Sequence, residues 1–431
     1  MGVFSILTSQ GFGYALVQRK DLQITTVHSI FWFLSFVGFA LSGLVLLSSP
    51  VLARFYGQPA VTPLMSVMAL SLVSGMTGAV PNALLQRALR FREINLVSIC
   101  GTVVSAGLGI GLAVVGYGYW ALILPTVGAS ISVACFAFLL SRYRPMAVFR
   151  WRDIGTTLHF GGSLTAANLL YYLAAYADSL VMARYWTPTD FGLYSFAVAR
   201  SRQFIILIGS QISGTILPAF SQMQDDGARM RSAYLRGTHV ICLAMFPVHV
   251  LIIGIADPLI PWIFGQQWRE AVPVFQILAA FAFVSGPSTL VTEALLSLNC
   301  PQGPLYYNML RMAVILPTLI WLGVSQQGIL ITAAVLMVLW IPLSVFYLAY
   351  FYRRIHVQWA ESWDSLNRLV VATIAMALTL MVSRHLQHTM GSPAWLIVVT
   401  SAAASSAVFW GMMRAPIAII IQQIRTALTD V

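Results

Sequence analysis

Charged side chains are scarce in this chain: only 9% of its 431 residues are Asp, Glu, Lys or Arg, whereas 59% are hydrophobic. Soluble domains carry about 25% charged residues. The polar surface is therefore too small to cover a water-soluble globule, and the mean hydropathy of +0.82 favours a membrane protein. The net charge of +11 does not indicate nucleic-acid binding, because the basic residues are scattered over short loops between apolar runs.

Cysteine is also scarce, and the motifs of common catalytic and metal sites are missing. Cys100, Cys135, Cys242 and Cys300 form no CxxC pair, so we interpret them as small hydrophobic residues. The chain has no HExxH motif, Walker loop or dinucleotide fingerprint. We therefore expect no metal, no cofactor and no catalytic residue.

Long apolar runs fill most of the chain. A membrane-spanning helix needs roughly 20 mostly apolar residues. After an apolar segment at 1–17, the runs predict twelve complete spans, at 28–48, 61–85, 95–115, 119–140, 158–183, 191–217, 236–256, 271–297, 304–324, 328–350, 367–383 and 393–413. In the third span, the spacing of Gly107 and Gly111 predicts a close contact between helices. The expected fold class is all-α, a polytopic membrane protein with two pseudo-repeated helical bundles and a C-terminal helix pair.

Apart from Arg200, Arg202 and Arg311, the Lys and Arg residues are distributed unevenly between alternate loops and the span ends beside them. If the loop after residue 17 faces the cytoplasm, seventeen lie on the cytoplasmic side, and the opposite loops receive only Arg54, Arg184, Arg269 and Arg384. Positive residues collect in cytoplasmic loops of membrane proteins. We therefore predict a multi-pass protein of the cytoplasmic (inner) membrane of a bacterium, with a cytoplasmic C-terminus.

Two stretches about 210 residues apart follow nearly the same pattern. Around Pro50 the chain reads SPVLARFYGQPAVTPLMSVMALSLVSG, and around Pro258 it reads ADPLIPWIFGQQWREAVPVFQILAAFAFVSG. In each stretch an apolar run ends at a Pro, a short amphipathic turn leads to an aromatic-Gly-Gln step, and a second apolar run ends in Val-Ser-Gly. Internal duplication in a membrane chain is typical of transporters that hold substrate between two similar bundles.

The repeat predicts three parts of the chain. Residues 1–145 form an N-terminal bundle, residues 146–357 a six-helix C-terminal bundle, and residues 358–431 a final helix pair with the tail. The second bundle has two spans before its copy of span 28–48, whereas the first has only the apolar segment at 1–17. By this register the first bundle is incomplete by about one and a half helices. A miscalled start, a truncation and a functional variant remain open explanations.

An ordered series of segments resembles one protein family. The series comprises FGYALVQRKD at 12–21, NALLQRALRF at 82–91, FGLYSFAVAR at 191–200 and ILPAFSQMQDD at 216–226. These segments resemble the polysaccharide and lipopolysaccharide O-unit flippases of the Wzx/WzxC type, which belong to the multidrug/oligosaccharidyl-lipid/polysaccharide exporter superfamily. The resemblance extends over roughly residues 10–350.

The resemblance implies a transporter rather than an enzyme. Its substrate would be a polyprenyl-pyrophosphate-linked oligosaccharide, flipped across the cytoplasmic membrane for surface or exopolysaccharide biosynthesis. Such a protein needs a polar cavity for the sugar, basic groups for the pyrophosphate, and a lateral opening for the lipid tail. The expected partners are this lipid-linked oligosaccharide and membrane lipid, with polysaccharide-assembly proteins left open.

Three arginines inside predicted spans are candidates for substrate binding. An arginine at a helix centre costs about 2.5–3.5 kcal/mol to insert, so it normally faces a cavity or a partner. Arg200 and Arg202 are about 200° apart around their helix and cannot both face one cavity. We favour Arg200 for the cavity and a structural or interfacial role for Arg202. Arg311 lies about two turns into its span, where it could line the cavity or reach the interface.

Two acids, Asp178 and Glu293, lie inside predicted spans. Either could bind a proton or a sodium ion and couple transport to the membrane potential. The alternative is an interhelical ion pair with one of the arginines or, for Asp178, a position at the outer interface.

Three neutral polar residues, Asn82, Asn168 and His28, also fall inside or at the start of spans. They could bind sugar hydroxyl groups, and we include them as candidate substrate-binding residues. A single polar group in a span is more often a hydrogen bond between helices.

Other functions remain open. A multidrug-type exporter of the same superfamily would have the same fold and a different cavity lining. A membrane polysaccharide polymerase or ligase usually needs a large outer domain or paired acids, whereas the outer loops here hold only the isolated Asp190, Asp257 and Glu270. A non-transporting membrane scaffold is a third alternative.

Overall fold

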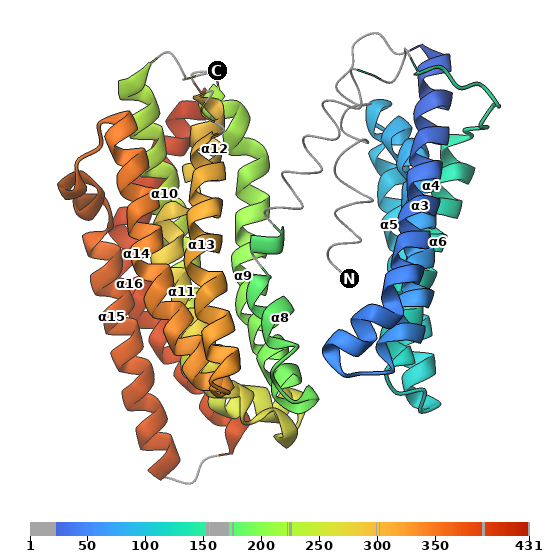
Figure 1. The fold of residues 1–431 in the computed structure, drawn as a ribbon. Helices are drawn as coiled ribbons and strands as arrows, with labels where there is room; N and C mark the ends of the chain where they lie inside the picture. Colours follow the sequence, from blue (N-terminus) through green and yellow to red (C-terminus); the bar gives the residue numbers. More distant parts are fainter. Residues whose placement is uncertain are drawn as a thin grey trace. The chain divides into compact units, whose positions relative to one another are not determined.

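The computed structural model describes residues 23–151, 155, 172–174, 176–221, 223, 226–298, 300, 302–389 and 393–429. Every regular element in these residues is a helix, which confirms the all-α class. The chain divides into two compact units, Met1–Tyr176 and Ala177–Val431 (Figure 1). The domain boundaries predicted at residues 145 and 357 stay predictions. The incomplete first bundle also stays a prediction, because residues 1–22 lie outside the described part.

Ten helices in the described residues are long and apolar enough to cross a membrane. They overlap ten of the twelve predicted spans. The predicted span 191–217 lies in a further helix, α9 (Pro188–Ser221), which is not among these ten. Most of the predicted span 158–183 lies outside the described residues, and only its end forms α8 (Ala177–Met182).

The described part of the first unit contains four long helices: α3 (Ile24–Tyr56), α4 (Val61–Arg87), α5 (Phe91–Val114) and α6 (Trp120–Ser141). Helix α4 packs between α3 and α6, and α5 packs on α6. Apolar residues at helical spacing form the contact between α3 and α4, where Ile30, Leu34, Met76 and Val80 are buried.

The second unit begins with α8 and α9 and continues with α10 (Gly227–Phe264), α11 (Ala271–Ser285), α12 (Val291–Ser297), α13 (Gln302–Val324), α14 (Ile329–Ile355), α15 (Trp359–Thr389) and α16 (Ala394–Thr429). Helix α11 packs between α10 and α14, while α13 packs on α14. Helix α10 also packs against the final pair, α15 and α16. The series from α10 to α14 thus repeats the packing order of α3 to α6.

The aromatic-Gly-Gln step of the repeat ends a long helix in both units. Helix α3 ends at Tyr56 and α10 ends at Phe264. The next residues, Gly57 and Gly265, have positive φ angles of 66° and 99°. Glycine adopts such angles without a steric penalty, so the helix stops and the chain reverses at this residue. The two stretches of similar sequence therefore fold into the same kind of helix end.

The two repeats differ in the helix that follows this turn. Helix α4 is continuous through Val73-Ser74-Gly75, whereas the second repeat changes at Gly286 from α11 into a 3₁₀ turn, Gly286–Ser288, before α12. Pro287 follows the glycine, and a proline has no N–H for the helical ladder. The Tyr234 hydroxyl donates to the Pro287 carbonyl at 2.7 Å. The backbone carbonyl of Pro287 at the helix break therefore has a hydrogen-bond donor on α10.

Glycines set the close approach of helices in the first unit. A Cβ at Gly78 would lie 3.0 Å from both Cα and Cβ of Ala134, and one at Gly101 would lie 2.6 Å from Val133. The predicted contact at Gly107 and Gly111 is wrong, since both are exposed and no described atom lies within 4 Å of a Cβ built there. The side of α5 that carries Gly101 packs on α6, and the side with Gly107 and Gly111 does not.

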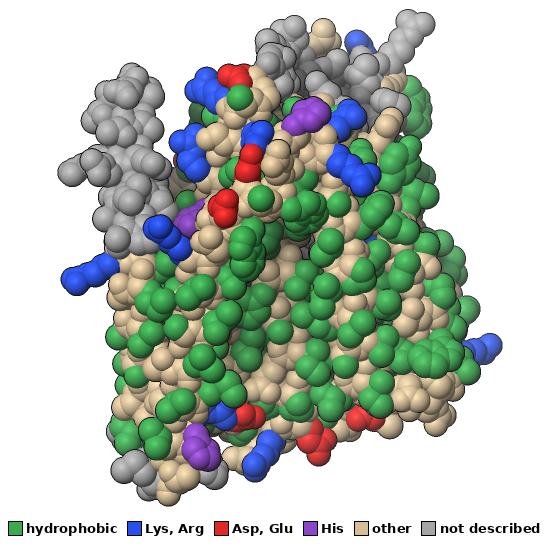
Figure 2. Space-filling model, turned by 90° about the vertical axis from the view of Figure 1, so that its left-hand side faces the viewer, with side chains coloured by type: hydrophobic (Ala, Val, Ile, Leu, Met, Phe, Trp, Pro, Cys, Tyr) green, Lys and Arg blue, Asp and Glu red, His purple; other side chains and the backbone are tan. Residues whose placement is uncertain are grey.

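Hydrophobic side chains form a broad band on the face shown in Figure 2, and most Lys, Arg, Asp and Glu side chains lie at its two ends. Large hydrophobic side chains such as Leu47, Val114 and Leu122 are more exposed than buried. Exposed apolar surface of this extent is what a lipid bilayer covers. The structure is therefore that of a multi-pass membrane protein.

Candidate functional site

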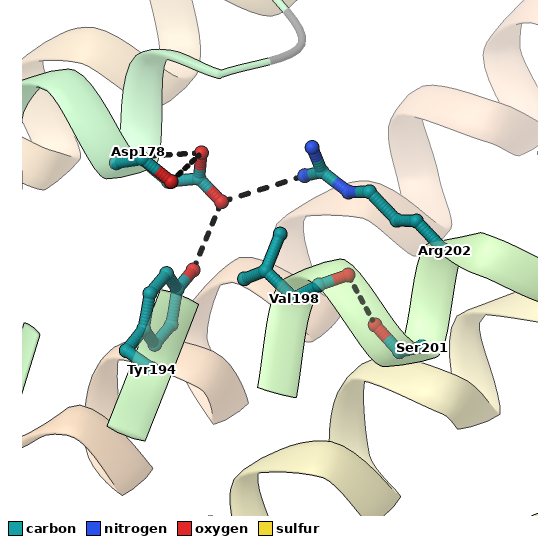
Figure 3. A network of polar contacts seen from close by, with 6 residues as sticks. Asp178, Tyr194, Val198, Ser201 and Arg202 are labelled. Carbon is teal, nitrogen blue, oxygen red and sulfur yellow. Dashed lines mark hydrogen bonds and ion pairs between the residues drawn. The ribbon is translucent and has the colours of Figure 1, made fainter. Parts of the chain in front are cut away.

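A buried carboxylate lies between helices α8 and α9 of the second unit. Asp178 is only 3% exposed. Its Oδ2 accepts a hydrogen bond from the Tyr194 hydroxyl at 3.0 Å and lies 3.4 Å from the Arg202 guanidinium (Figure 3). Its Oδ1 accepts the backbone N–H of Ser179 at 2.8 Å. Both carboxylate oxygens are therefore hydrogen-bonded, as a buried charge requires.

The spacing of residues on α9 explains how two side chains reach the same carboxylate. Tyr194, Val198 and Arg202 follow one another at intervals of four residues, which places them on one side of the helix. Tyr194 and Val198 are buried, and Arg202 is partly buried with 22% of its side chain exposed. This side of α9 faces α8, so Asp178 neutralises the charge of Arg202 within the unit.

A tryptophan on α14 extends this cluster to further helices. The guanidinium carbon of Arg202 lies 6.0 Å from the ring centroid of Trp340, and that of Arg311 on α13 lies 5.9 Å from it. The Phe281 ring of α11 packs on Trp340 at 4.8 Å. A guanidinium within about 6 Å of an indole ring is attracted to it. Trp340 thus brings Arg202 and Arg311, two of the predicted site residues, to one aromatic ring.

Arg200 lies on a different side of α9 from Arg202, as the helical spacing requires. It is exposed, and its guanidinium donates to the Gln203 side chain at 2.8 Å. Its guanidinium carbon lies 5.9 Å from the Phe196 ring and 5.8 Å from the Phe264 ring. The described part of the chain places no acid in a salt bridge with Arg200. Arg200 therefore presents a positive charge that no described acid of its unit neutralises in a salt bridge.

The second predicted acid, Glu293, lies in the first turn of α12. The neighbouring Thr292 hydroxyl is hydrogen-bonded to the Tyr347 hydroxyl at 3.0 Å. Residues of α12 belong to a core cluster with Tyr347 and Phe351, whereas the residues around Asp178 belong to a second cluster. The two predicted ion-coupling acids thus have different surroundings.

The neutral candidates His28 and Asn82 lie in the first unit. His28 is buried on α3, where its Nδ1 accepts the backbone N–H of Met146 at 3.3 Å and lies 2.9 Å from the Tyr143 hydroxyl. These contacts fit the packing alternative for His28. Asn82 is partly buried on α4 beside Pro81. Asn168 lies outside the described residues.

Two residues of the cluster, Tyr194 and Trp340, were not predicted from the sequence. Tyr194 precedes Arg202 by two helical turns, and this spacing was a usable signal. Trp340 lies on a helix far along the chain, and only the packing of α14 brings it to α9 and α13.

Residues 1–273 of the chain match the family described as polysaccharide biosynthesis protein. Over 279 residues the chain is 25% identical to the teichuronic acid biosynthesis protein TuaB of Bacillus subtilis, which covers 64% of this chain and 57% of TuaB. Over 276 residues it is 26% identical to the succinoglycan biosynthesis transport protein ExoT of Rhizobium meliloti, and this match covers 64% of this chain and 56% of ExoT. Over 338 residues it is 23% identical to the lipopolysaccharide biosynthesis protein WzxC of Escherichia coli, and this match covers 77% of this chain and 68% of WzxC. The chain thus spans somewhat more than half of the length of TuaB and ExoT.

A solved structure has a similar fold. The lipid II flippase MurJ in its inward closed conformation aligns with a TM-score of 0.69, covering 95% of this chain and 90% of MurJ. The sequence identity is 12%, so the likeness concerns the fold.

Proposed function

Because the chain belongs to the family of polysaccharide biosynthesis proteins, we propose that it flips a polyprenyl-pyrophosphate-linked oligosaccharide across the cytoplasmic membrane. The oligosaccharide would serve the assembly of a surface or exported polysaccharide. The similarity to ExoT, a succinoglycan transport protein, and to WzxC, a lipopolysaccharide biosynthesis protein, supports this substrate class. The fold that the chain shares with the lipid II flippase MurJ supports movement of a lipid-linked sugar. Transport also agrees with the multi-pass helical fold.

The observation that carries the proposal is the position of Arg200. It lies twelve residues after Pro188, the start of α9, and so roughly 18 Å along the helix at about 1.5 Å per residue. Its guanidinium carbon lies 5.8 Å from the ring of Phe264, the last residue of α10, so Arg200 is near one end of the bundle. An exposed arginine at this position avoids the lipid tails by facing water, such as that of a polar cavity. We infer that Arg200 lines the substrate cavity.

The chemistry of the substrate suits this arginine. A pyrophosphate carries several anionic oxygens, and a guanidinium offers a planar set of donors that matches them. The pair of Asp178 and Arg202 is neutral, which leaves Arg200 as the cation of this stretch of α9 available to a ligand. The Phe196 and Phe264 rings restrict its guanidinium and lower the entropy lost on binding.

The remaining roles predicted from the sequence stay predictions. The contacts of Asp178 support the ion-pair alternative that the sequence left open. Ion coupling by Asp178 or Glu293 and substrate binding by Arg311, Asn82, Asn168 or His28 are part of the proposal. The cytoplasmic position of the C-terminus and the existence of an assembly partner are also part of the proposal.

Transport of a reconstituted glycolipid tests the proposal directly. Full-length protein in vesicles that contain a polyprenyl-pyrophosphate oligosaccharide should expose the sugar on the opposite leaflet, and Arg200→Gln should slow this exposure at least about tenfold. Arg236→Gln is the matched control, because Arg236 is an exposed arginine near the start of α10 that contacts the Ser232 carbonyl. Clear efflux of cationic drugs without glycolipid translocation would instead assign a multidrug exporter.

A cellular experiment separates flipping from polymerisation. Loss of the protein should abolish the surface polysaccharide and leave single lipid-linked repeat units on the cytoplasmic leaflet. A polymerase or ligase would leave those units on the outer leaflet, and that result would contradict the proposal.

A further inference from the structure

An apolar cleft of about 610 Å³ runs between α10, α14 and α15 of the second unit. Its lining is almost wholly hydrophobic and includes Val250, Leu348, Trp363, Leu366, Val370 and Ile374. Of its three hydroxyl-bearing side chains, Ser362 and Tyr352 are hydrogen-bonded to each other at 2.7 Å, and Thr373 donates to the Leu369 carbonyl at 2.7 Å. The cleft therefore suits a hydrocarbon chain and offers little to a polar ligand.

The cleft is long enough to cross the hydrocarbon layer. On α15 its lining extends from Trp359 to Met381, which is roughly 33 Å along a helix that rises about 1.5 Å per residue. The hydrocarbon layer of a bilayer is about 30 Å thick. At one end are Trp359 and Trp363, and tryptophan is enriched at the membrane interface.

The other end of the cleft continues into a charged mouth. Met381 also lines a second cleft of about 630 Å³, whose lining includes Asp257, Arg269, Arg384 and His385. The Arg384 guanidinium forms a salt bridge with Asp257 at 2.7 Å and donates to the Gly254 carbonyl. These contacts tie α15 to α10 at the point where the two clefts join.

The mouth has one positive charge in excess. Asp257 balances Arg384, and no acid in the described residues forms a salt bridge with the exposed Arg269. Among these charged groups, one monoanionic ligand balances the excess charge of Arg269. A phosphodiester carries one negative charge, whereas a pyrophosphate carries more than one. Charge therefore favours a phospholipid over the polyprenyl pyrophosphate of the proposed substrate.

We propose that the joined clefts bind an anionic phospholipid of the membrane. Its phosphodiester lies at Arg269 and Arg384, and an acyl chain lies along α15 in the apolar cleft. This site is separate from Arg200 on α9, and it gives the final helix pair a role in lipid binding. The arginines of the mouth balance the charge of a glycerol-phosphate headgroup, and the apolar cleft accommodates the acyl chain attached to it.

Lipid retention by the purified full-length protein tests this site. In native mass spectrometry, phosphatidylglycerol should remain bound about tenfold more than phosphatidylethanolamine with the same acyl chains, and Arg269→Gln should remove this preference. Arg184→Gln is the matched control, because Arg184 is an exposed arginine outside both clefts. Equal retention of the two lipids, or an unchanged preference in Arg269→Gln, would refute the proposal.

A second pair of variants tests the apolar part. Ile374 and Leu378 are both exposed on α15, at 54% and 58%, but only Ile374 lines the apolar cleft. Ile374→Trp should displace phosphatidylglycerol, and Leu378→Trp should not. If undecaprenyl phosphate displaces bound phosphatidylglycerol at equal concentration, the cleft belongs to the polyprenyl chain and the phospholipid assignment is wrong.

Discussion

Arg202 and Asp178 form a salt bridge of 3.4 Å inside the second helical unit, with Asp178 almost fully buried. The pair joins α9 to α8 and keeps a charge of each sign away from lipid. Arg200, only two residues earlier, has no such acid in the described residues. Two arginines of one helix therefore have different surroundings: Arg202 is paired with an acid, and Arg200 is the one that we propose binds a ligand.

Replacing Asp178 with Asn should destabilise the protein. Removing one partner of a buried ion pair costs about 3–5 kcal/mol, and the lower end applies because Arg202 keeps 22% of its side chain exposed. Thermal unfolding in detergent measures the loss. Asp190→Asn is the control, since Asp190 is bonded to Thr187 at an exposed site and should have little effect. If the double variant Asp178→Asn/Arg202→Gln is no more stable than Asp178→Asn, the pair does not act as a unit.

Replacing Arg200 with Gln should leave stability unchanged within about 0.5 kcal/mol, because Arg200 is exposed and its hydrogen bond to Gln203 is local. Surface polysaccharide should nevertheless decrease strongly in cells that depend on this variant. Arg200→Lys keeps the charge and loses the planar donors, so it should retain part of the activity. A folded Arg200→Gln protein with full polysaccharide output would contradict a role in the cavity.

Replacing Gly78 with Val should weaken the first unit by about 1–3 kcal/mol, because the new side chain collides with the Ala134 backbone across the contact of α4 and α6. Gly107→Val makes the same chemical change in a helix at an exposed position with no described atom within 4 Å of its Cβ. This control should be nearly neutral. Thermal unfolding of the two variants measures the difference in their stability. Equal losses of stability would show that the contact of Gly78 with Ala134 does not limit the packing of α4 on α6.

The hydroxyl of Tyr143 should ionise at unusually high pH. Tyr143 lies after the end of α6, and burial raises its pKa from 10.0 to about 12. The folded state favours the neutral phenol, so its contribution to stability is complete below pH 10 and disappears as the pH rises through about 12. The difference in ultraviolet absorbance between wild type and Tyr143→Phe reports this one group. A midpoint near 10 would show that the phenol is open to water.

Local features of the sequence predicted much of the fold. Apolar length predicted the spans, but the predicted ends at residues 48 and 256 were too early. Helices α3 and α10 continue through Pro50 and Pro258 and end before Gly57 and Gly265, whose positive φ angles depend on the glycine itself. The contact at Gly107 was wrong because the packed side of α5 depends on where α6 lies. The polar cluster was predicted in part, since Asp178 and Arg202 are conspicuous in apolar spans. Their partner Trp340 depends on the packing of α14 and has no local signal.

The helix break at Gly286 and Pro287 gives the two repeats different helix paths. In the first repeat α4 continues through Val73-Ser74-Gly75, and its proline, Pro81, comes six residues after that glycine. In the second repeat the proline directly follows the glycine, and α11 and α12 are separate helices joined by a 3₁₀ turn. Similar sequence patterns thus need not give helices of the same direction, and Glu293 on α12 belongs to a segment that the backbone ladder of α11 does not reach.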